Sequence, residues 1–259
     1  MTPTAARFVW HELMTSDAKA AAAFYTAVLG WTTKSGAMPE FDYTLASAGG
    51  TEVAGLMDLT PDAVAAGAPL AWLGYVAVSD VDAKAAAAQA AGGTVCHPPT
   101  DIPQVGRFAT IADPHGAVVC LFKGSGSDEA PVSDPAAPGN IGWNELYTDD
   151  LAAAWAFYSG LFTWTKHTAI DMGPMGVYQL FTPGPGLPPT GGMMKRPPDV
   201  PRACWLHYFN VAALDAAIGR VRGAGGQVLT EPMQVPGGSW VVTCLDPHGA
   251  AFALVGPQR

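Results

Sequence analysis

The stretch WHEL at residues 10–13 returns as WNEL at residues 143–146, and DPHG at residues 113–116 returns unchanged at residues 246–249. Both pairs are 133 positions apart. Other positions keep the same spacing: Phe24–Tyr25 with Phe157–Tyr158, Trp31 with Trp164, Trp72–Leu73 with Trp205–Leu206, Tyr75 with Tyr208, and Gly92–Gly93 with Gly225–Gly226. A preserved register of this length indicates a duplicated domain, and differences between the copies indicate where the two have specialised.

The repeat predicts two homologous domains, residues 1–123 and 140–259, joined by a linker over residues 124–139. The linker is rich in Gly, Ser, Pro and acidic residues, which is typical of an exposed tether. One local shift occurs, because AGLM at residues 54–57 resembles GGMM at residues 191–194 with a spacing of 137. We interpret it as an insertion in a Pro/Gly-rich loop, where insertions cost little stability.

Within each repeat, the order strand, helix and three strands is predicted to occur twice. In the first repeat we expect strands over residues 7–14, 41–46, 53–59, 70–78, 94–97, 107–112 and 117–122, helices ending at Leu29 and Ala91, and an extended segment after Trp31. Gly30 and Gly92 end the helices, residues 61–69 break the pattern, and DPHG forms a turn between strands. The prediction is an α+β fold of four βαβββ modules with curved, barrel-like mixed sheets.

Composition and charge exclude several classes of partner. The net charge of −9, with only 13 Lys and Arg residues, argues against nucleic acids and anionic membranes. No sequence segment has the features of a membrane span or a secretion signal, so we expect a cytoplasmic protein. The cysteines at positions 96, 120, 204 and 244 show no CxxC spacing, and we expect buried free thiols.

The motifs together resemble those of the vicinal oxygen chelate superfamily, which includes glyoxalase I, bleomycin-resistance proteins and extradiol dioxygenases. The resemblance rests on the first strand, the FY pair and Leu-Gly-Trp that follow it (residues 24–31), and the DPHG hairpin, in both repeats. Metal-using members carry His, Gln or Glu ligands at three strand positions. In this chain those positions hold Trp10 and Trp143, Leu73 and Leu206, and Cys120 and Ala253. A shift of one residue at the middle position would instead give Trp72, Gly74, Trp205 or His207.

No complete ligand set is therefore expected, and we predict no metal and no cofactor. A shift of one residue in the comparison would make His11 a ligand, so a metal-dependent glyoxalase or dioxygenase remains an alternative. Strand alternation argues against it, because it places His11 and Leu13 under the helix and Trp10, Glu12 and Met14 on the opposite face. Phe24, Trp31 and their counterparts in the second repeat are interpreted as packing residues.

Candidate site residues follow from the open face of the strands. The acid–base candidates are Glu145, Glu12 and His207, the last being the histidine expected to line a cavity. Glu12 and Glu145 are also compatible with a structural role, bonded to backbone amides or Arg107. The predicted ligand-binding residues are Trp10, Glu12, Met14, Met57, Tyr75, Arg107, Trp143, Glu145, Tyr147, Met194, His207, Tyr208 and Trp240, and Tyr178 is a further candidate in the second repeat.

Two functions are compatible with this set. The first is metal-independent binding of an aromatic or polycyclic small molecule, such as an antibiotic or pathway intermediate, as in sequestration or resistance; the resemblance implies this class. The second is a metal-independent lyase, isomerase or hydroxylase-type enzyme with a Glu as acid or base. The sequence leaves open which half binds, how the modules pair, and whether the protein forms a homodimer.

Overall fold

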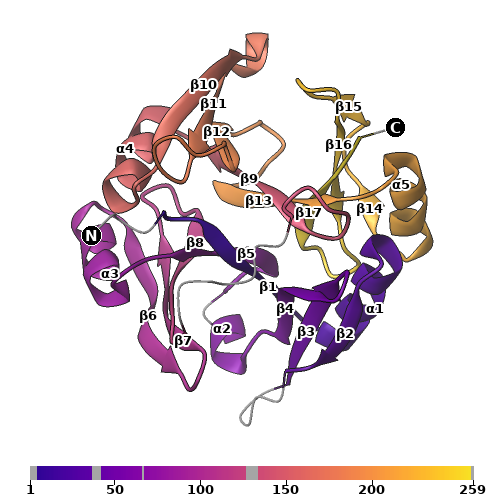
Figure 1. The fold of residues 1–259 in the computed structure, drawn as a ribbon, viewed down its shortest axis with the longest axis horizontal. Helices are drawn as coiled ribbons and strands as arrows, with labels where there is room; N and C mark the ends of the chain where they lie inside the picture. The colour runs from indigo at the N-terminus through magenta and orange to yellow at the C-terminus, as the bar shows by residue number, and fades with distance from the viewer. Residues whose placement is uncertain (1–4, 37–41, 66, 127–133, 258–259) are drawn as a thin grey trace. The chain divides into compact units, whose positions relative to one another are not determined.

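The computed structural model describes residues 5–36, 42–65, 67–126 and 134–257, and its elements divide into four modules (Figure 1). Module 1 contains β1 (Phe8–Thr15), α1 (Ala18–Leu29), β2 (Thr32–Ser35), β3 (Tyr43–Ala48) and β4 (Thr51–Asp58). Module 2 contains β5 (Ala71–Ala77), α3 (Val81–Ala90), β6 (Thr94–Ile102), β7 (Gly106–Ala112) and β8 (Val118–Gly124). The predicted break between them holds a short helix, α2 (Pro61–Ala65), that the sequence did not indicate.

The second repeat has the same order. Module 3 contains β9 (Ile141–Thr148), α4 (Leu151–Leu161), β10 (Thr165–Asp171), the 3-10 helix η1 (Gly173–Met175), β11 (Val177–Thr182) and β12 (Gly191–Lys195). Module 4 contains β13 (Cys204–Asn210), α5 (Leu214–Gly223), β14 (Gln227–Val228), β15 (Met233–Gln234), β16 (Trp240–Leu245) and β17 (Ala251–Gly256). The predicted α+β fold of four βαβββ modules is confirmed.

Local sequence explains where the helices begin and end. Asp17, Asp80 and Asp150 precede α1, α3 and α4, and each side chain accepts a hydrogen bond from a backbone amide in the first turn. Gly30 ends α1 with φ of 74°, a left-handed conformation that favours glycine. No helix in the described part of the chain is long and apolar enough to cross a bilayer.

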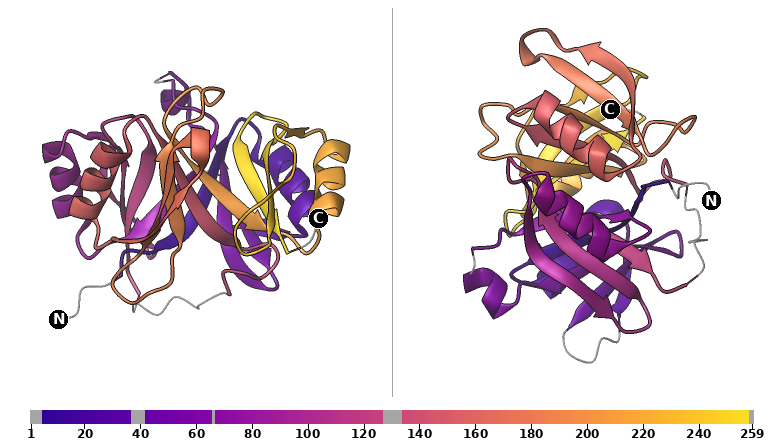
Figure 2. Two further views of the ribbon diagram at one scale, coloured as in Figure 1. Left: turned by 90° about the horizontal axis from the view of Figure 1, so that it is seen from above. Right: turned by 90° about the vertical axis from the view of Figure 1, so that its left-hand side faces the viewer.

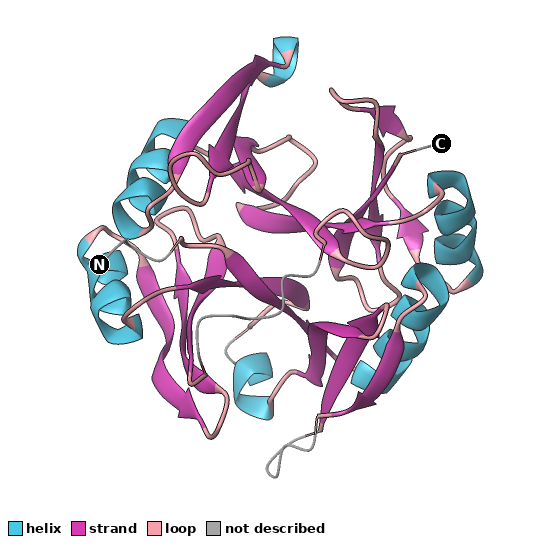
Figure 3. Ribbon diagram, viewed as in Figure 1, coloured by secondary structure: helices cyan, strands magenta, loops and turns pink. Residues whose placement is uncertain are grey.

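The strands form two curved mixed sheets of eight and nine strands (Figure 3). In each module, the first strand pairs in parallel with the last: β1 with β4, β5 with β8, β9 with β12, and β13 with β17. The remaining strands continue antiparallel from the last one, for example in the order β1, β4, β3 and β2. This arrangement leaves one face of each module for its helix, and we call the opposite face the open face.

The chain folds into two compact units that combine modules from different repeats. Unit 1 holds modules 2 and 3, from Gly74–Val132 and Trp143–Trp205 with the segment up to Val9. Unit 2 holds modules 1 and 4, from Trp10–Leu73 and Leu206–Arg259 with Ser133–Gly142. In unit 1 helices α3 and α4 pack together, and in unit 2 helices α1 and α5 do (Figure 2). The repeats seen in the sequence are thus not the compact units of the fold.

Each unit has its own aromatic core beneath its helices. In unit 2, Leu13 packs with Tyr25, Trp31, Trp72 and Phe209. In unit 1, Leu146 packs with Tyr158, Trp164, Phe181 and Trp205. The predicted helix-covered face of β1 and β9 is therefore confirmed, as is the packing role of Phe24, Trp31, Phe157 and Trp164, each at most 5% exposed.

The repeated motifs hold the modules of each unit together. In unit 2 the Tyr25 hydroxyl accepts a hydrogen bond from Trp72 Nε1 at 2.8 Å and donates one to Asp246 Oδ2 at 3.2 Å. Asp246, the first residue of its DPHG turn, also accepts bonds from the backbone amides of His248 and Ala250. The FY motif of the first repeat is thereby joined to the DPHG motif of the second.

Unit 1 contains the reciprocal arrangement. The Tyr158 hydroxyl accepts from Trp205 Nε1 at 3.1 Å and donates to Asp113 Oδ2 at 3.2 Å, and Asp113 accepts the amides of His115 and Ala117. These hydrogen bonds offset the cost of burying the two carboxylates. The motifs that reveal the duplication therefore lie where one repeat contacts the other. We refer to these two arrangements as the Tyr–Asp clamps.

Candidate functional site

Two hydrogen-bonded Trp–Tyr–Glu triads lie on the open faces of modules 1 and 3. In module 1, Trp10 Nε1 donates to the Tyr43 hydroxyl at 3.1 Å, and that hydroxyl donates to Glu12 Oε2 at 2.9 Å. Trp10 and Tyr43 are half-buried, whereas Glu12 is only 9% exposed. The hydroxyl of Tyr43 thus links the indole to the buried carboxylate.

Module 3 repeats this arrangement in unit 1. Trp143 Nε1 donates to the Tyr178 hydroxyl at 2.7 Å, and Tyr178 donates to the carboxylate of Glu145. Glu145 is 7% exposed, and the two rings are half-buried. The triads therefore give each of these faces accessible aromatic rings beside a hydrogen-bonded carboxylate.

A glycine on the intervening strand makes each triad possible. Tyr43 on β3 must cross β4 to reach Glu12 on β1, and Gly55 lies opposite Glu12 in the strand register. In module 3, Tyr178 on β11 crosses β12 at Gly192, which lies opposite Glu145. A Cβ at either glycine would overlap the tyrosine ring. These glycines are required by close approach of a side chain, and neither has a left-handed backbone.

Tyr43 is the functional candidate that the sequence analysis missed. It lies 135 positions before Tyr178, and the repeat was identified at a spacing of 133, so the two tyrosines were not matched. The signal that could have revealed it is the AGLM and GGMM pair. The glycines of this pair mark the strand that each tyrosine crosses.

Several predicted residues surround the triads. Met14 lies opposite Met57 across β1 and β4, on the same face as Glu12. Tyr147 lies opposite Met194 across β9 and β12, on the same face as Glu145. The half-buried thiol of Cys204 lies near Glu145 and interacts with it electrostatically. The structure thus brings Trp10, Glu12, Met14 and Met57 together in module 1, and Trp143, Glu145, Tyr147 and Met194 together in module 3.

Tyr75 and Tyr208 lie on the corresponding strands of modules 2 and 4. Tyr75 lies opposite Cys120. Its ring centroid lies 6.3 Å from that of Phe108 and 6.2 Å from that of Phe122. Tyr208 lies opposite Ala253 on β17. Both tyrosines are less than one tenth exposed. They belong to the open faces of their own modules.

Three predicted residues have other positions. Arg107 bonds to Asp82 and Asp101 at distances of 2.7–2.9 Å, on the surface of module 2. Trp240 packs at the margin of the unit 2 core. His207 is fully buried and its ring centroid lies 4.7 Å from that of His11, so it does not line an open face as expected. Alternation along β13 explains this, because His207 shares the core face with Phe209.

The cysteines show a further difference from expectation. All four are free thiols, and Cys120 and Cys244 are buried as predicted. Cys96 is exposed, because it lies on β6 at the end of the strand order. Burial raises the pKa of the Cys204 thiol to about 11, so this group stays protonated beside Glu145.

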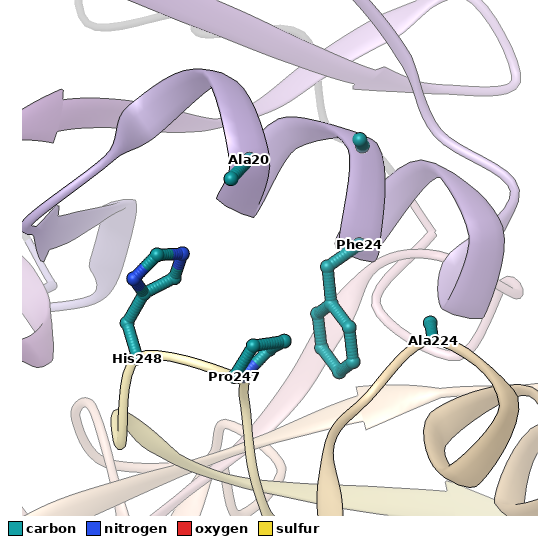
Figure 4. A pocket seen from close by; sticks show the side chains of 6 residues that line it. Ala20, Phe24, Ala224, Pro247 and His248 are labelled. Atoms are coloured by element: carbon teal, nitrogen blue, oxygen red, sulfur yellow. The ribbon is translucent and has the colours of Figure 1, made fainter.

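A shallow groove occurs elsewhere in unit 2 (Figure 4). It measures about 370 Å³ and is lined by Ala20, Ala23, Phe24, Ala224, Pro247 and His248. His248 Nδ1 lies 3.0 Å from Ser16 Oγ. Its lining has a single titratable side chain, whereas each triad combines a carboxylate with two polar aromatic groups. The triad faces are therefore the stronger candidates for a ligand site.

The phenols of both triads are held in the neutral form. Burial raises the pKa of Tyr43 and of Tyr178 well above the ordinary value, and the charges of Glu12 and Glu145 raise them further. Tyr25 and Tyr158 in the clamps are shifted in the same direction, first by burial and then by Asp246 and Asp113. Each tyrosine is therefore a hydrogen-bond donor to a carboxylate and not a base.

This shift predicts alkaline unfolding. In the unfolded chain the four phenols ionise near pH 10, whereas the folded protein keeps them neutral, so the free energy of unfolding falls as pH rises above about 10. We expect phenolate absorbance and loss of the circular dichroism signal to rise together in an alkaline titration. Ionisation of all seven tyrosines near pH 10 with an intact fold would contradict the assignment.

Comparison with known proteins identifies the family. The model of the Glyoxalase/Bleomycin resistance protein/Dioxygenase superfamily matches residues 7–121 and 140–254. The chain belongs to this superfamily. The match covers both repeats, so the resemblance inferred from the motifs is confirmed for the duplicated chain as a whole.

Two kinds of relative cover nearly the whole chain. "Putative glyoxylase CFP32" of Mycobacterium tuberculosis is 35% identical over 251 residues, spanning 96% of this chain and 94% of that protein. The anthracycline biosynthesis protein DauV of Streptomyces sp. is 32% identical over 257 residues, spanning 95% and 91%. DnrV of Streptomyces peucetius, also named as an anthracycline biosynthesis protein, has the same identity and coverage.

Solved structures of the superfamily share the fold. An Mn(II)-bound glyoxalase from Novosphingobium aromaticivorans has a TM-score of 0.61 at 18% identity, covering 98% of this chain and 82% of that one. A halotolerant catechol dioxygenase has a TM-score of 0.65 at 13% identity, covering 98% and 87%. At these identities the likeness extends to the fold alone.

By the register inferred from the motifs, other residues take the metal-ligand positions of this superfamily in this chain. The three strand positions hold Trp10 and Trp143, Leu73 and Leu206, and Cys120 and Ala253, of which only Cys120 has a ligating side chain. Across the residues that the structure describes, no three His, Cys, Asp or Glu side chains come close enough to hold a metal ion. Trp10, the residue that the motif register assigns to the first ligand position, is hydrogen-bonded to Tyr43. The residues present do not fit a metal site of this type.

Proposed function

We propose that this chain binds a planar aromatic or polycyclic small molecule, without a metal ion, on the open faces that carry the Trp–Tyr–Glu triads. The observation that carries the proposal is the duplicated triad. In both copies half-buried indole and phenol rings surround a buried carboxylate that is already held by a hydrogen bond. Rings of this kind stack on planar ligands, and a fixed carboxylate accepts a ligand hydroxyl or amine.

The relatives support the same chemical class. DauV and DnrV are named for anthracycline biosynthesis, and anthracyclines are polycyclic aromatic compounds that carry hydroxyl groups. A metal-dependent reaction would need a set of ligands at positions that this chain fills with Trp, Leu, Cys and Ala. Capture of an antibiotic or pathway intermediate, as in sequestration or resistance, needs only the rings and the carboxylate.

The buried carboxylates favour one alternative. Glu145 lies at 7% exposure beside a tyrosine that remains protonated, so it is the group that could remove a proton from a bound ligand. The alternative function is therefore a metal-independent lyase, isomerase or hydroxylase-type enzyme that uses Glu145 or Glu12. The two functions differ in the fate of the ligand.

Titration with quinizarin, a planar dihydroxyanthraquinone, tests the proposal. We expect saturable quenching of tryptophan fluorescence, unchanged by a metal chelator. Trp143→Leu should weaken binding about tenfold at the module 3 face, because one aromatic stack contributes about 1.5 kcal/mol. Trp155→Leu removes another half-buried indole of unit 1, from helix α4, and should leave the affinity unchanged.

The outcomes separate the alternatives. Quinizarin recovered unchanged supports binding alone, whereas a product that disappears with Glu145→Gln supports the enzyme. Binding that requires added metal contradicts metal independence. Absence of saturable quenching, or equal affinities for wild type and a Trp10→Leu/Trp143→Leu double variant, contradicts the proposed site.

A further inference from the structure

We infer that the two triad faces select different ligands, and that Tyr147 is the specificity-determining residue through which the module 3 face selects a hydroxylated ring. This inference rests on the proposed function. The inference goes beyond that function by assigning the two faces different chemistry and by naming a residue that makes them different.

The two faces differ beside the carboxylate, at the position two residues after it. Two residues after Glu12 the chain has Met14, and two residues after Glu145 it has Tyr147. Both side chains are half-buried, and both lie opposite a methionine, Met57 for Met14 and Met194 for Tyr147. The duplication thus places a thioether and a phenol at equivalent positions on equivalent strands.

The phenol of Tyr147 is one of several polar side chains around Glu145. Tyr147 and Tyr178 interact electrostatically, and the protonated thiol of Cys204 also lies close to Glu145. The module 3 face therefore combines two phenols, an indole N–H, a thiol and a carboxylate. A hydroxyl-bearing ligand can both donate to and accept from such groups.

The module 1 face has a different character. Met14 and Met57 form a pair of flexible, polarisable side chains beside Trp10 and Tyr43. The additional charged group that acts on Tyr43 is Glu52, an exposed carboxylate paired with Lys34 at 2.8 Å. Thioethers contact aromatic rings favourably and form only weak hydrogen bonds, so this face suits a ring without hydroxyl groups.

Hydrogen bonding sets how strongly each face should discriminate between a hydroxylated ligand and its analogue without the hydroxyl. A site that hydrogen-bonds a ligand hydroxyl rejects the analogue without it, because its own polar groups then lose a partner. A methionine-lined site gains little from the hydroxyl. One hydrogen bond of about 1.4 kcal/mol corresponds to about a tenfold preference.

The test compares quinizarin with anthraquinone, which has the same rings and no hydroxyl groups. Each face is measured in a background where binding at the other is weakened about tenfold, Trp10→Leu for module 3 and Trp143→Leu for module 1. We expect the module 3 face to prefer quinizarin about tenfold and the module 1 face to show no such preference. Tyr147→Phe, which keeps the ring, should remove the preference, and Met14→Tyr should create it in module 1.

The results distinguish this inference from the proposed function. If Tyr147→Phe keeps the preference for quinizarin, the specificity assignment is wrong while the binding function stands. The specificity assignment is also wrong if the two faces, with Met14 and Tyr147 unchanged, prefer quinizarin over anthraquinone equally. If neither compound binds to either background or to the wild type, the proposed function itself fails.

Discussion

Asp246→Ala is expected to lower the free energy of unfolding by about 3–5 kcal/mol. The carboxylate is 2% exposed and accepts hydrogen bonds from the Tyr25 hydroxyl and the amides of His248 and Ala250. Alanine leaves three buried donors without their acceptor, each at a cost of about 1–3 kcal/mol, partly offset by relaxation. Equilibrium urea unfolding followed by circular dichroism measures the loss.

Matched variants isolate the Tyr–Asp clamp. Glu231→Ala removes an exposed carboxylate of the same unit and should change stability by less than about 0.5 kcal/mol. Tyr25→Phe removes one bond of the clamp and should cost about 1–2 kcal/mol, with less than additive loss when combined with Asp246→Ala. Asp113→Ala should reproduce the effect in unit 1. A change below about 0.5 kcal/mol for both Asp variants would show that the clamps do not hold the modules together.

Gly192→Ala is expected to abolish ligand binding at the module 3 face and to lower stability by about 1–3 kcal/mol. The added methyl group would overlap the ring of Tyr178, which must then leave its position and lose its bonds to Trp143 and Glu145. Quinizarin titration in the Trp10→Leu background measures the binding, and urea unfolding measures the stability.

Glycine at another position provides the control. Gly160 lies exposed in helix α4, and a methyl group added there would meet no atom within 4 Å, so Gly160→Ala should leave binding intact and raise stability by up to about 1 kcal/mol. Adding Tyr178→Ala to Gly192→Ala removes the overlap and should restore stability to that of Tyr178→Ala alone. Normal quinizarin binding by Gly192→Ala would contradict the requirement for the triad.

Local patterns predicted the elements well, because they depend on neighbours in the chain. The stop at Gly30 lies next to the helix that it ends. Alternation along β1 assigned Leu13 to the core and Glu12 to the open face for the same reason. The short helix α2 was not predicted, since a helix of five residues that begins at Pro61 has too little periodicity to reveal it.

The candidate site was predicted in part. The pairing of Trp10 with Glu12 and of Trp143 with Glu145 is visible in the sequence, since strand residues two apart share a face. Tyr43 was missed, because its position depends on how the strands cross and pack. The register of β3 against β4 places Tyr43 opposite Met57, from where its ring lies over Gly55, and no property of Tyr43 alone indicates this.

The sequence by itself determined the duplication, the four modules and the superfamily, because these follow from spacing and residue type along the chain. Only the tertiary structure decided that each compact unit takes one module from each repeat, and that tyrosines link the Trp and Glu side chains. The physical reason is that Tyr25 and Tyr43 reach their partners across space, and the hydrogen bonds that fix them join residues that sequence spacing does not relate.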